Sequence, residues 1–261
     1  MKIIVLLKMV PDVVEELELA ADGRELDTQF LRMIANELDV HALEEALLLK
    51  ERYSGSVTVV ALDAPEVDDA LFAALAKGAD QALKITDGNG TIGARACAYR
   101  FAQVLSSVPG LLPVDLILTG AQAIDDLDGL TSPLVAHHLR LPQLAIVTKI
   151  RVDSTAGVAT VLREFPGGVR GEYEVKLPAV LGIQAAEKPP RYVPVAKVRA
   201  AMKSQAIQPV PVPTAADAGA GLSQVEKMAK PEVSQHAQML QGSPEEIANQ
   251  FCEILATRGL L

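Results

Sequence analysis

Val114–Ala136 reads VDLILTGAQAIDDLDGLTSPLVA, and this stretch decides the fold that we predict for the chain. Residues 114–119 form a short apolar run rich in branched side chains, which is typical of a strand buried on both faces of a parallel sheet. The run ends at Gly120, and Ser132-Pro133 then supplies an N-cap residue and a proline at the first helical position. This order is typical of nucleotide sites in α/β folds, because unpaired backbone N–H groups and the helix dipole converge at the loop.

The charges of the loop leave its role open. It carries Asp125, Asp126 and Asp128 but no Lys or Arg, so a phosphate would depend on backbone N–H groups and on the hydroxyls of Thr131 and Ser132. A carboxylate that faces a ribose or base would accept hydrogen bonds from hydroxyl groups. Alternatively, the carboxylates bind a divalent cation, since clustered carboxylates are hard oxygen ligands. A third interpretation is a solvated loop whose Asp residues form turns.

Strands and helices alternate in the sequence before this loop. The predicted strands cover residues 3–8, 57–62 and 82–85, and the predicted helices begin after Asp39, at Val67 and at Thr91, the last after a turn at 87–90. Asn36 or Asp39 is expected to cap the first helix, and Asp22-Gly23 predicts a surface hairpin over residues 14–26. The βαβ spacing favours a doubly wound, mostly parallel sheet, with function at strand ends such as Lys8.

The second half of the chain departs from this alternation. After a helix over 133–140, strands are predicted at 144–152, 158–165 and 172–177, then an apolar strand at 177–183. A helix is predicted at 195–202, a linker rich in Pro and Ala at 204–221, and a helix at 244–258 with a capping box of Ser243 and Glu246. We therefore predict a nucleotide-binding α/β domain over 1–190 with an antiparallel extension. Residues 191–261 are expected to form a docking segment, a linker and a C-terminal helical arm.

Composition excludes several classes of protein. The formal net charge of −9 argues against a nucleic-acid partner, which needs a basic surface. Cys97 and Cys252 lie far apart without the spacing of a zinc site, and no metal ligands are assigned. The apolar N-terminus lacks a signal-peptide cleavage region and no run is long enough to span a bilayer, so we expect no membrane insertion and a cytoplasmic location.

Several motifs in this chain resemble, in the same order, the β subunit of electron transfer flavoproteins. They are KMVPD at 8–12, NELDVHALEEALLLK at 36–50, KGAD at 77–80, GAQAIDDLDGLTSP at 120–133, Arg163-Glu164 before Gly167-Gly168, and LPAVLGIQ at 177–184 followed by PRY at 190–192. The tail MLQGSPEEIANQFCEIL at 239–255 is similar to the C-terminal extension of β subunits that serve bacterial amine dehydrogenases. The resemblance covers nearly the whole chain.

The resemblance implies a Rossmann-like sheet related to adenine nucleotide alpha hydrolases and a structural AMP in this subunit. It also implies an α subunit that holds most of the FAD. The AMP-binding positions implied are Leu6, Asn36, Glu37, Leu38, Asp39, Asp63, Gly120, Ala121, Gln122, Ala123, Ile124, Asp125, Asp126, Leu127, Asp128, Gly129, Leu130 and Thr131.

Further roles follow from the same resemblance. Val13 and Leu38 fall where β subunits approach the flavin, and Glu164 matches a residue that holds the FAD-bearing domain of the α subunit through an Arg ion pair. Residues 191–200 match a segment that docks on a dehydrogenase, with Val195 at the apolar anchor position. The chain is then an electron carrier subunit with no catalytic residue of its own. It accepts electrons from a dehydrogenase and passes them to a quinone reductase or ferredoxin-type acceptor.

Departures from the family pattern keep alternatives open. Ala121 stands where Lys or Arg is frequent, Glu37 where proline is common, and Ser132 where glycine often follows the Thr. In relatives that split electron pairs between two acceptors, a second FAD occupies the pocket instead of AMP. An ATP-using hydrolase would need a basic, glycine-rich phosphate loop, and a nucleotide-sensing protein would need neither the docking segment nor the tail.

Overall fold

The computed structural model describes residues 1–86, 93–211, 225–231, 237 and 239–261. They form two units, Met1–Val225 and Glu226–Leu261, each of which is described by itself. The predicted turn at 87–90, the predicted helix start at Thr91 and part of the predicted linker, 212–221, lie outside the described residues.

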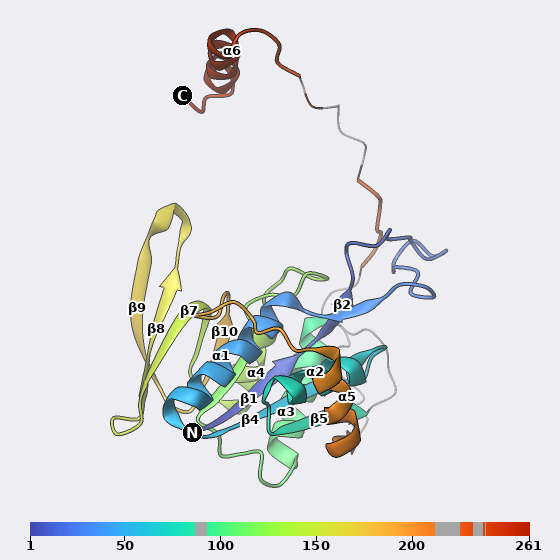
Figure 1. The fold of residues 1–261 in the computed structure, drawn as a ribbon, viewed down its shortest axis with the longest axis vertical. Helices are drawn as coiled ribbons and strands as arrows, with labels where there is room; N and C mark the ends of the chain where they lie inside the picture. The colour runs from blue at the N-terminus through green and yellow to red at the C-terminus, as the bar shows by residue number, and fades with distance from the viewer. Residues whose placement is uncertain (87–92, 212–224, 232–236, 238) are drawn as a thin grey trace. The chain divides into compact units, whose positions relative to one another are not determined.

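A nine-stranded sheet forms the centre of the first unit, in the order β11-β5-β4-β1-β6-β10-β7-β8-β9 (Figure 1). From β11 to β7 the neighbouring strands are parallel, whereas β7, β8 and β9 are antiparallel. The predicted mostly parallel sheet with an antiparallel extension is therefore confirmed. The strands are β1 (Lys2–Leu7), β4 (Ser56–Leu62), β5 (Gln81–Thr86), β6 (Leu116–Gly120), β7 (Gln143–Asp153), β8 (Val158–Glu164), β9 (Arg170–Lys176), β10 (Ala179–Ile183) and β11 (Ile207–Pro211).

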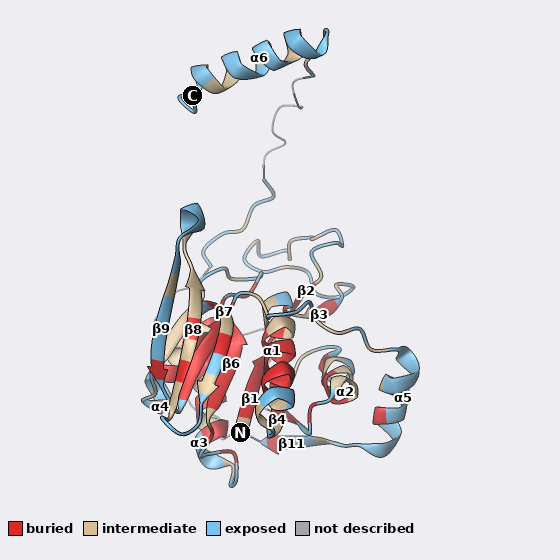
Figure 2. Cartoon of the chain, turned by 60° about the vertical axis from the view of Figure 1, so that its left-hand side comes forward, coloured by how far each residue is buried: buried red, intermediate tan, exposed pale blue. Residues whose placement is uncertain are grey.

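Helices cover both faces of this sheet. They are α1 (Glu37–Tyr53), α2 (Val67–Lys77), α3 (Ala94–Ser107), α4 (Thr131–Leu139) and α5 (Val195–Ser204). Because successive side chains of a strand point to opposite faces, Ile3 and Val5 of β1 pack in the cluster that contains α1 and α2 residues. Ile4 and Leu6 pack with α3 and α4 residues on the other face. Figure 2 shows the resulting buried interior as red strands between the helices.

The order in which successive strands are added to the sheet changes direction at β1, and this point locates the candidate site. The parallel strands β4 and β5 continue the sheet on one side of β1, and β6 and β10 continue it on the other. In open α/β sheets, ligands bind beyond the carboxyl ends of the strands at such a switch point. The switch point here is formed by the ends of β1 and β6, and the loop after β6 is the loop that the sequence predicted to bind a nucleotide.

The predicted cap of the helix after the β6 loop is wrong. Ser132 does not cap α4, because the helix begins at Thr131 and the N-cap residue is Leu130. The Asp128 carboxylate accepts the Leu130 N–H at 2.9 Å and turns the chain into the helix two residues earlier than predicted. Ser132 is instead buried, and its hydroxyl accepts a hydrogen bond from Gln143 Nε2 at 3.2 Å.

The hairpin predicted over 14–26 is present in a shorter form. Leu19 bridges Leu26, and the N–H groups of Ala20 and Asp27 donate to the carbonyl oxygens of Glu25 and Glu18 at 2.9 Å, around a turn in which Gly23 has a φ of +65°. Nearby, β2 (Met9–Pro11) and β3 (Met33–Ala35) form a two-stranded antiparallel sheet that was not predicted. The predicted linker also contains a strand, because β11 pairs in parallel with β5.

The second unit contains α6 (Pro244–Thr257). Its predicted capping box is confirmed, since the Glu246 N–H donates to Ser243 Oγ and the Glu246 carboxylate accepts the Ser243 N–H at 2.7 Å. None of the residues of α6 is buried. Within the described part of the chain, we find no helix that combines the length and apolar character required to cross a membrane.

Candidate functional site

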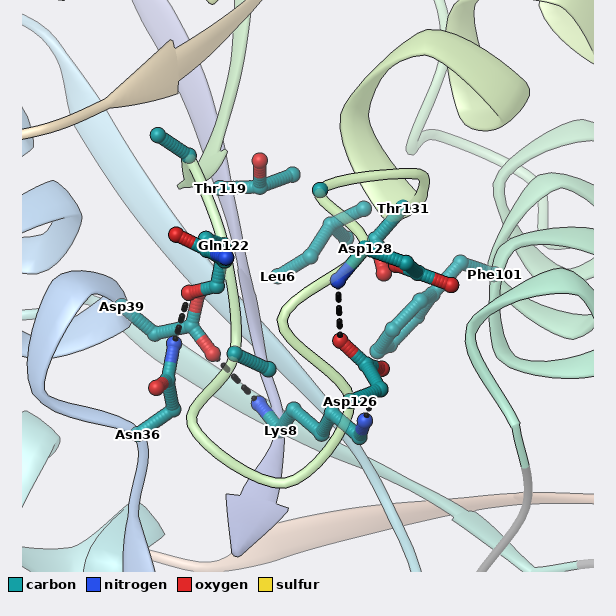
Figure 3. Close-up of a pocket in the computed structure, with 13 residues that line it drawn as sticks. Leu6, Lys8, Asn36, Asp39, Phe101, Thr119, Gln122, Asp126, Asp128 and Thr131 are labelled. Atoms are coloured by element: carbon teal, nitrogen blue, oxygen red, sulfur yellow. Dashed lines mark hydrogen bonds and ion pairs between the residues drawn. The ribbon is translucent and has the colours of Figure 1, made fainter. Parts of the chain in front are cut away.

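A cavity lies at the carboxyl ends of β1 and β6, between the start of α1 and the loop that leads into α4 (Figure 3). Its volume is about 20 Å³, which is room for one or two water molecules. Its lining brings together sequence positions separated by more than one hundred residues. The lining residues are Leu6, Lys8, Asn36, Asp39, Phe101, Thr119, Ala121, Gln122, Ala123, Asp126, Asp128, Gly129 and Thr131.

Asp39 joins three elements at this cavity. Its carboxylate accepts the backbone N–H of Lys8 at 2.9 Å and that of Gly120 at 2.5 Å, so it ties the start of α1 to the ends of β1 and β6. Complete burial raises the pKa of the Asp39 carboxyl to about 6, although the two N–H donors oppose that rise. Asp39 therefore supports the walls of the cavity.

Neither residue that was expected to cap α1 does so with its side chain. Asn36 occupies the N-cap position, but it makes no side-chain capping bond. Its amide Nδ2 donates instead to the Gln122 carbonyl oxygen at 3.0 Å and fastens the loop to α1. Gly120 is required here by space: a Cβ at this position would lie 2.7 Å from Asp39 Oδ1 and 2.8 Å from the Leu38 Cβ.

The loop acquires its missing positive charge from Lys8, the residue that follows β1. Lys8 Nζ lies 2.8 Å from Asp125 Oδ1 and 2.8 Å from Asp126 Oδ2, with 10% of the lysine side chain exposed. Burial by itself lowers the pKa of the Lys8 ammonium, but its hydrogen bonds to the two aspartates and their charges outweigh burial, so that pKa is raised. We call this arrangement the Lys8 clasp. The sequence predicted that Lys8 lies at the functional end of a strand, but it did not predict the ion pairs of Lys8 with Asp125 and Asp126.

Short polar contacts shape the remainder of the loop. Asp126 Oδ1 accepts the Asp128 N–H at 3.3 Å, and the Gln122 side chain donates to the Leu127 carbonyl oxygen at 2.5 Å. Leu127 and Gly129 have φ values of +53° and +64°. Among the described residues, no group of three or more His, Cys, Asp or Glu side chains is arranged to hold a metal ion.

The structure brings ten of the implied AMP positions into the lining of the cavity. Phe101 and Thr119 also line the cavity, although neither was predicted as a site residue; Phe101 comes from α3. The implied positions that do not line the cavity are Glu37, Leu38, Asp63, Gly120, Ile124, Asp125, Leu127 and Leu130. Asp63 follows β4, one strand away from β1, and its carboxylate lies 3.8 Å from Lys84 Nζ.

The residues expected at partner interfaces lie outside the cavity and reach solvent. Val13 is 56% exposed and Val195, at the start of α5, is 61% exposed. Leu38 is half-buried. The Glu164 carboxylate lies 3.1 Å from Arg170 Nε, and both side chains are partly open to solvent.

Two motifs of the resemblance, NELDVHALEEALLLK and PRY, meet along α1. Glu44 accepts the backbone N–H of Arg191 at 2.9 Å and its guanidinium Nη2 at 2.9 Å, and Glu51 accepts Nη1 at 2.7 Å. Hydrogen bonds and charges from these two carboxylates raise the pKa of Arg191 above its usual range. Glu45 Oε2 accepts the Glu187 N–H at 2.8 Å. The chain that precedes α5 is thus fastened to α1.

A family model of the electron transfer flavoprotein domain matches residues 26–218. The chain belongs to the electron transfer flavoprotein family. The electron transfer flavoprotein β subunit of Methylophilus methylotrophus is 32% identical over 266 residues, which is 98% of this chain and 98% of the relative. That of Clostridium acetobutylicum is 35% identical over 199 residues, 76% of this chain and 74% of the relative.

FixA of Azotobacter vinelandii is also similar, with 37% identity over 153 residues, 57% of this chain and 53% of the relative. The chain is thus an electron transfer flavoprotein β subunit of the group that includes FixA. A β subunit implies an α-subunit partner, and the family implies association with a flavin in the heterodimer.

Proposed function

We propose that this β subunit binds a structural AMP in the cavity at the ends of β1 and β6 and helps to hold the FAD of its α subunit. In this proposal the heterodimer carries electrons from a dehydrogenase to a quinone reductase or ferredoxin-type acceptor. FAD supplies the redox chemistry when bound, and the β subunit supplies a rigid base, so it is an electron carrier rather than an enzyme. The observation that carries the proposal is the cavity itself, which gathers Asn36, Asp39 and the loop after β6 at the switch point of the sheet.

The chemistry of the lining fits an adenine nucleotide. Leu6 and Phe101 offer apolar surface, and the Asn36 and Gln122 side chains offer amide groups. The start of α4 offers unpaired N–H groups beside the Thr131 hydroxyl, which suit a phosphate. A nucleotide is much larger than the present cavity, so its binding requires the lining to open around it.

The exposed positions outside the cavity suit the partner contacts. Val13 and Leu38 are proposed to lie near the flavin, and Val195 is proposed to anchor the dehydrogenase, because exposed apolar side chains are suited to burial in an interface. Glu164 is proposed to bind an arginine of the α subunit. That contact would compete with Arg170, whose exposed pairing with Glu164 costs little to break.

The test is to coexpress the chain with its α subunit, purify the heterodimer, denature it and quantify the released nucleotides against protein. One AMP and one FAD per heterodimer are expected. Release of two FAD and no AMP per heterodimer would mean that a second flavin occupies the cavity in place of AMP, and would assign the protein to the electron-bifurcating type. A stable heterodimer that released FAD but no second adenine nucleotide would refute binding at the cavity.

A further inference from the structure

We propose that Lys8 is the phosphate-binding residue of the cavity and that Asp125 and Asp126 position its ammonium for that contact. The inference rests on the proposed function, since it requires an adenine nucleotide at this site. Lys8 is the basic residue among the described side chains that line the cavity. No other lining side chain supplies a full positive charge to offset a bound phosphate.

The charges around the cavity make this cation necessary. Asp39, Asp126 and Asp128 line the cavity, and Asp125 lies beside them on the same loop. A phosphate that approached these carboxylates would be repelled, and backbone N–H groups carry only partial positive charge. The Lys8 ammonium offsets part of this negative charge at the end of β1.

The geometry leaves the ammonium able to bind a third group. A lysine ammonium has three N–H donors, and the clasp directs two of them to Asp125 and Asp126. Within the described residues, the third donor is not engaged in a hydrogen bond or ion pair. Lys8 lines the cavity, and Figure 3 shows its side chain extending to Asp126. A phosphate oxygen would therefore complete the coordination of Lys8 without breaking the clasp.

The clasp also removes most of the cost of holding a flexible lysine in one place. The four-carbon side chain of a free lysine loses rotamer entropy when it binds a ligand. The Lys8 side chain is already buried, with only 10% of it exposed, and its ammonium is held by two aspartates. Burial of the stem between β1 and the loop limits solvent screening of the charge. Asp125 and Asp126 are thus positioning residues, and Lys8 is the residue that contacts the nucleotide.

The test compares wild-type heterodimer with Lys8→Met, Lys8→Arg and the control Lys50→Met. Lys50 bonds to Asp80 and Gly78 and does not line the cavity, so the control removes an ion-paired lysine of the same chain elsewhere. Each heterodimer is stripped of nucleotide, and AMP and adenosine affinities are measured by calorimetry. Lys8→Met should weaken AMP binding about tenfold or more and adenosine binding less than about threefold, whereas Lys8→Arg and Lys50→Met should bind both as the wild type does.

A second readout follows the phosphate itself. In ³¹P NMR, the bound AMP phosphate should titrate at a lower pH in the wild type than in Lys8→Met, because a nearby cation favours the dianion. Two results together would overturn the role of Lys8 while leaving AMP binding intact. The ratio of AMP affinity to adenosine affinity would be the same in wild type and Lys8→Met, and the bound phosphate would titrate at the same pH in both. If the heterodimer carries a second FAD instead, Lys8→Met must release that FAD and Lys50→Met must not. A wild type that binds no adenine nucleotide would refute both the proposed function and this inference.

Discussion

Replacement of Asp39 by asparagine tests the physical basis of the cavity. A pKa of about 6 in the folded chain compares with about 3.9 in an unfolded chain. Because one pH unit is worth about 1.4 kcal/mol, the difference corresponds to about 3 kcal/mol of free energy of unfolding. Burial is the cause of the raised pKa, so the ionised carboxylate is held in the folded chain at this cost despite its two N–H donors.

The sign of the effect follows from proton binding. Below about pH 4 both the folded and unfolded chains hold the proton, and the stability that Asp39 contributes is fully present. Between about pH 4 and pH 6 the folded chain binds more protons than the unfolded chain, so the free energy of unfolding falls as the pH rises. Above about pH 6 the stability that the protonated Asp39 contributes is fully lost. Asparagine does not titrate, so the free energy of unfolding of Asp39→Asn lacks this pH-dependent contribution.

The assay is urea unfolding of the purified chain at pH values from 4 to 7, followed by circular dichroism. The free energy of unfolding of wild type minus that of Asp39→Asn should fall by about 2 kcal/mol over this range, because part of the total effect lies below pH 4. Thr119→Val, a buried and uncharged change at the end of β6, serves as the control and should give a constant difference. A constant or rising difference for Asp39→Asn would refute burial as the dominant effect on this carboxyl.

Three further changes test other parts of the structure. Gly120→Ala should lower the free energy of unfolding by about 1–3 kcal/mol in urea titrations, because its Cβ would lie 2.7 Å from a carboxylate oxygen. The control Gly93→Ala, with no described atom within 4 Å of its Cβ, should change it by less than about 0.5 kcal/mol. Glu44→Gln should speed hydrogen exchange of the Arg191 amide and cost about 1–3 kcal/mol, because the pair is partly buried; unchanged exchange would show that the pair does not hold this segment. Ser243→Ala should lower the helicity of α6, at about 1 kcal/mol, in circular dichroism of a 239–261 peptide, and equal helicity would contradict the capping box.

Local composition was enough to predict most of the sheet. The apolar runs of β1, β4 and β6 are buried on both faces, so their sequences carry a continuous signal that does not depend on distant residues. The same local reasoning failed at β11. Its sequence, IQPVP, contains two prolines and resembles a linker. A strand at the edge of a sheet tolerates proline because one side of its backbone needs no ladder bond, and β11 is such an edge strand.

The candidate site was predictable as a set of strand and helix ends, but not in its contacts. The loop after β6 contains only acidic charges, and its compensating lysine lies 117 residues away from Asp125 in the sequence. Nothing in the local pattern of either segment specifies this pairing. The same holds for Ser132, whose local sequence favours an N-cap. Asp128 turns the chain earlier, and the serine hydroxyl is left to bind Gln143.

Helix α1 connects the cavity at the ends of β1 and β6 with the chain segment that contains Arg191. Its 17 residues span about 25 Å at 1.5 Å per residue, with Asp39 at the cavity in its first turn and Glu44 on Arg191 further along. A bound nucleotide that fixes the start of α1 would therefore also fix the helix to which the docking segment is fastened. If the proposed function holds, this connection gives a physical reason for retaining a nucleotide that transfers no electrons. The nucleotide would then hold the segment proposed to dock on the dehydrogenase in a constant position relative to the sheet.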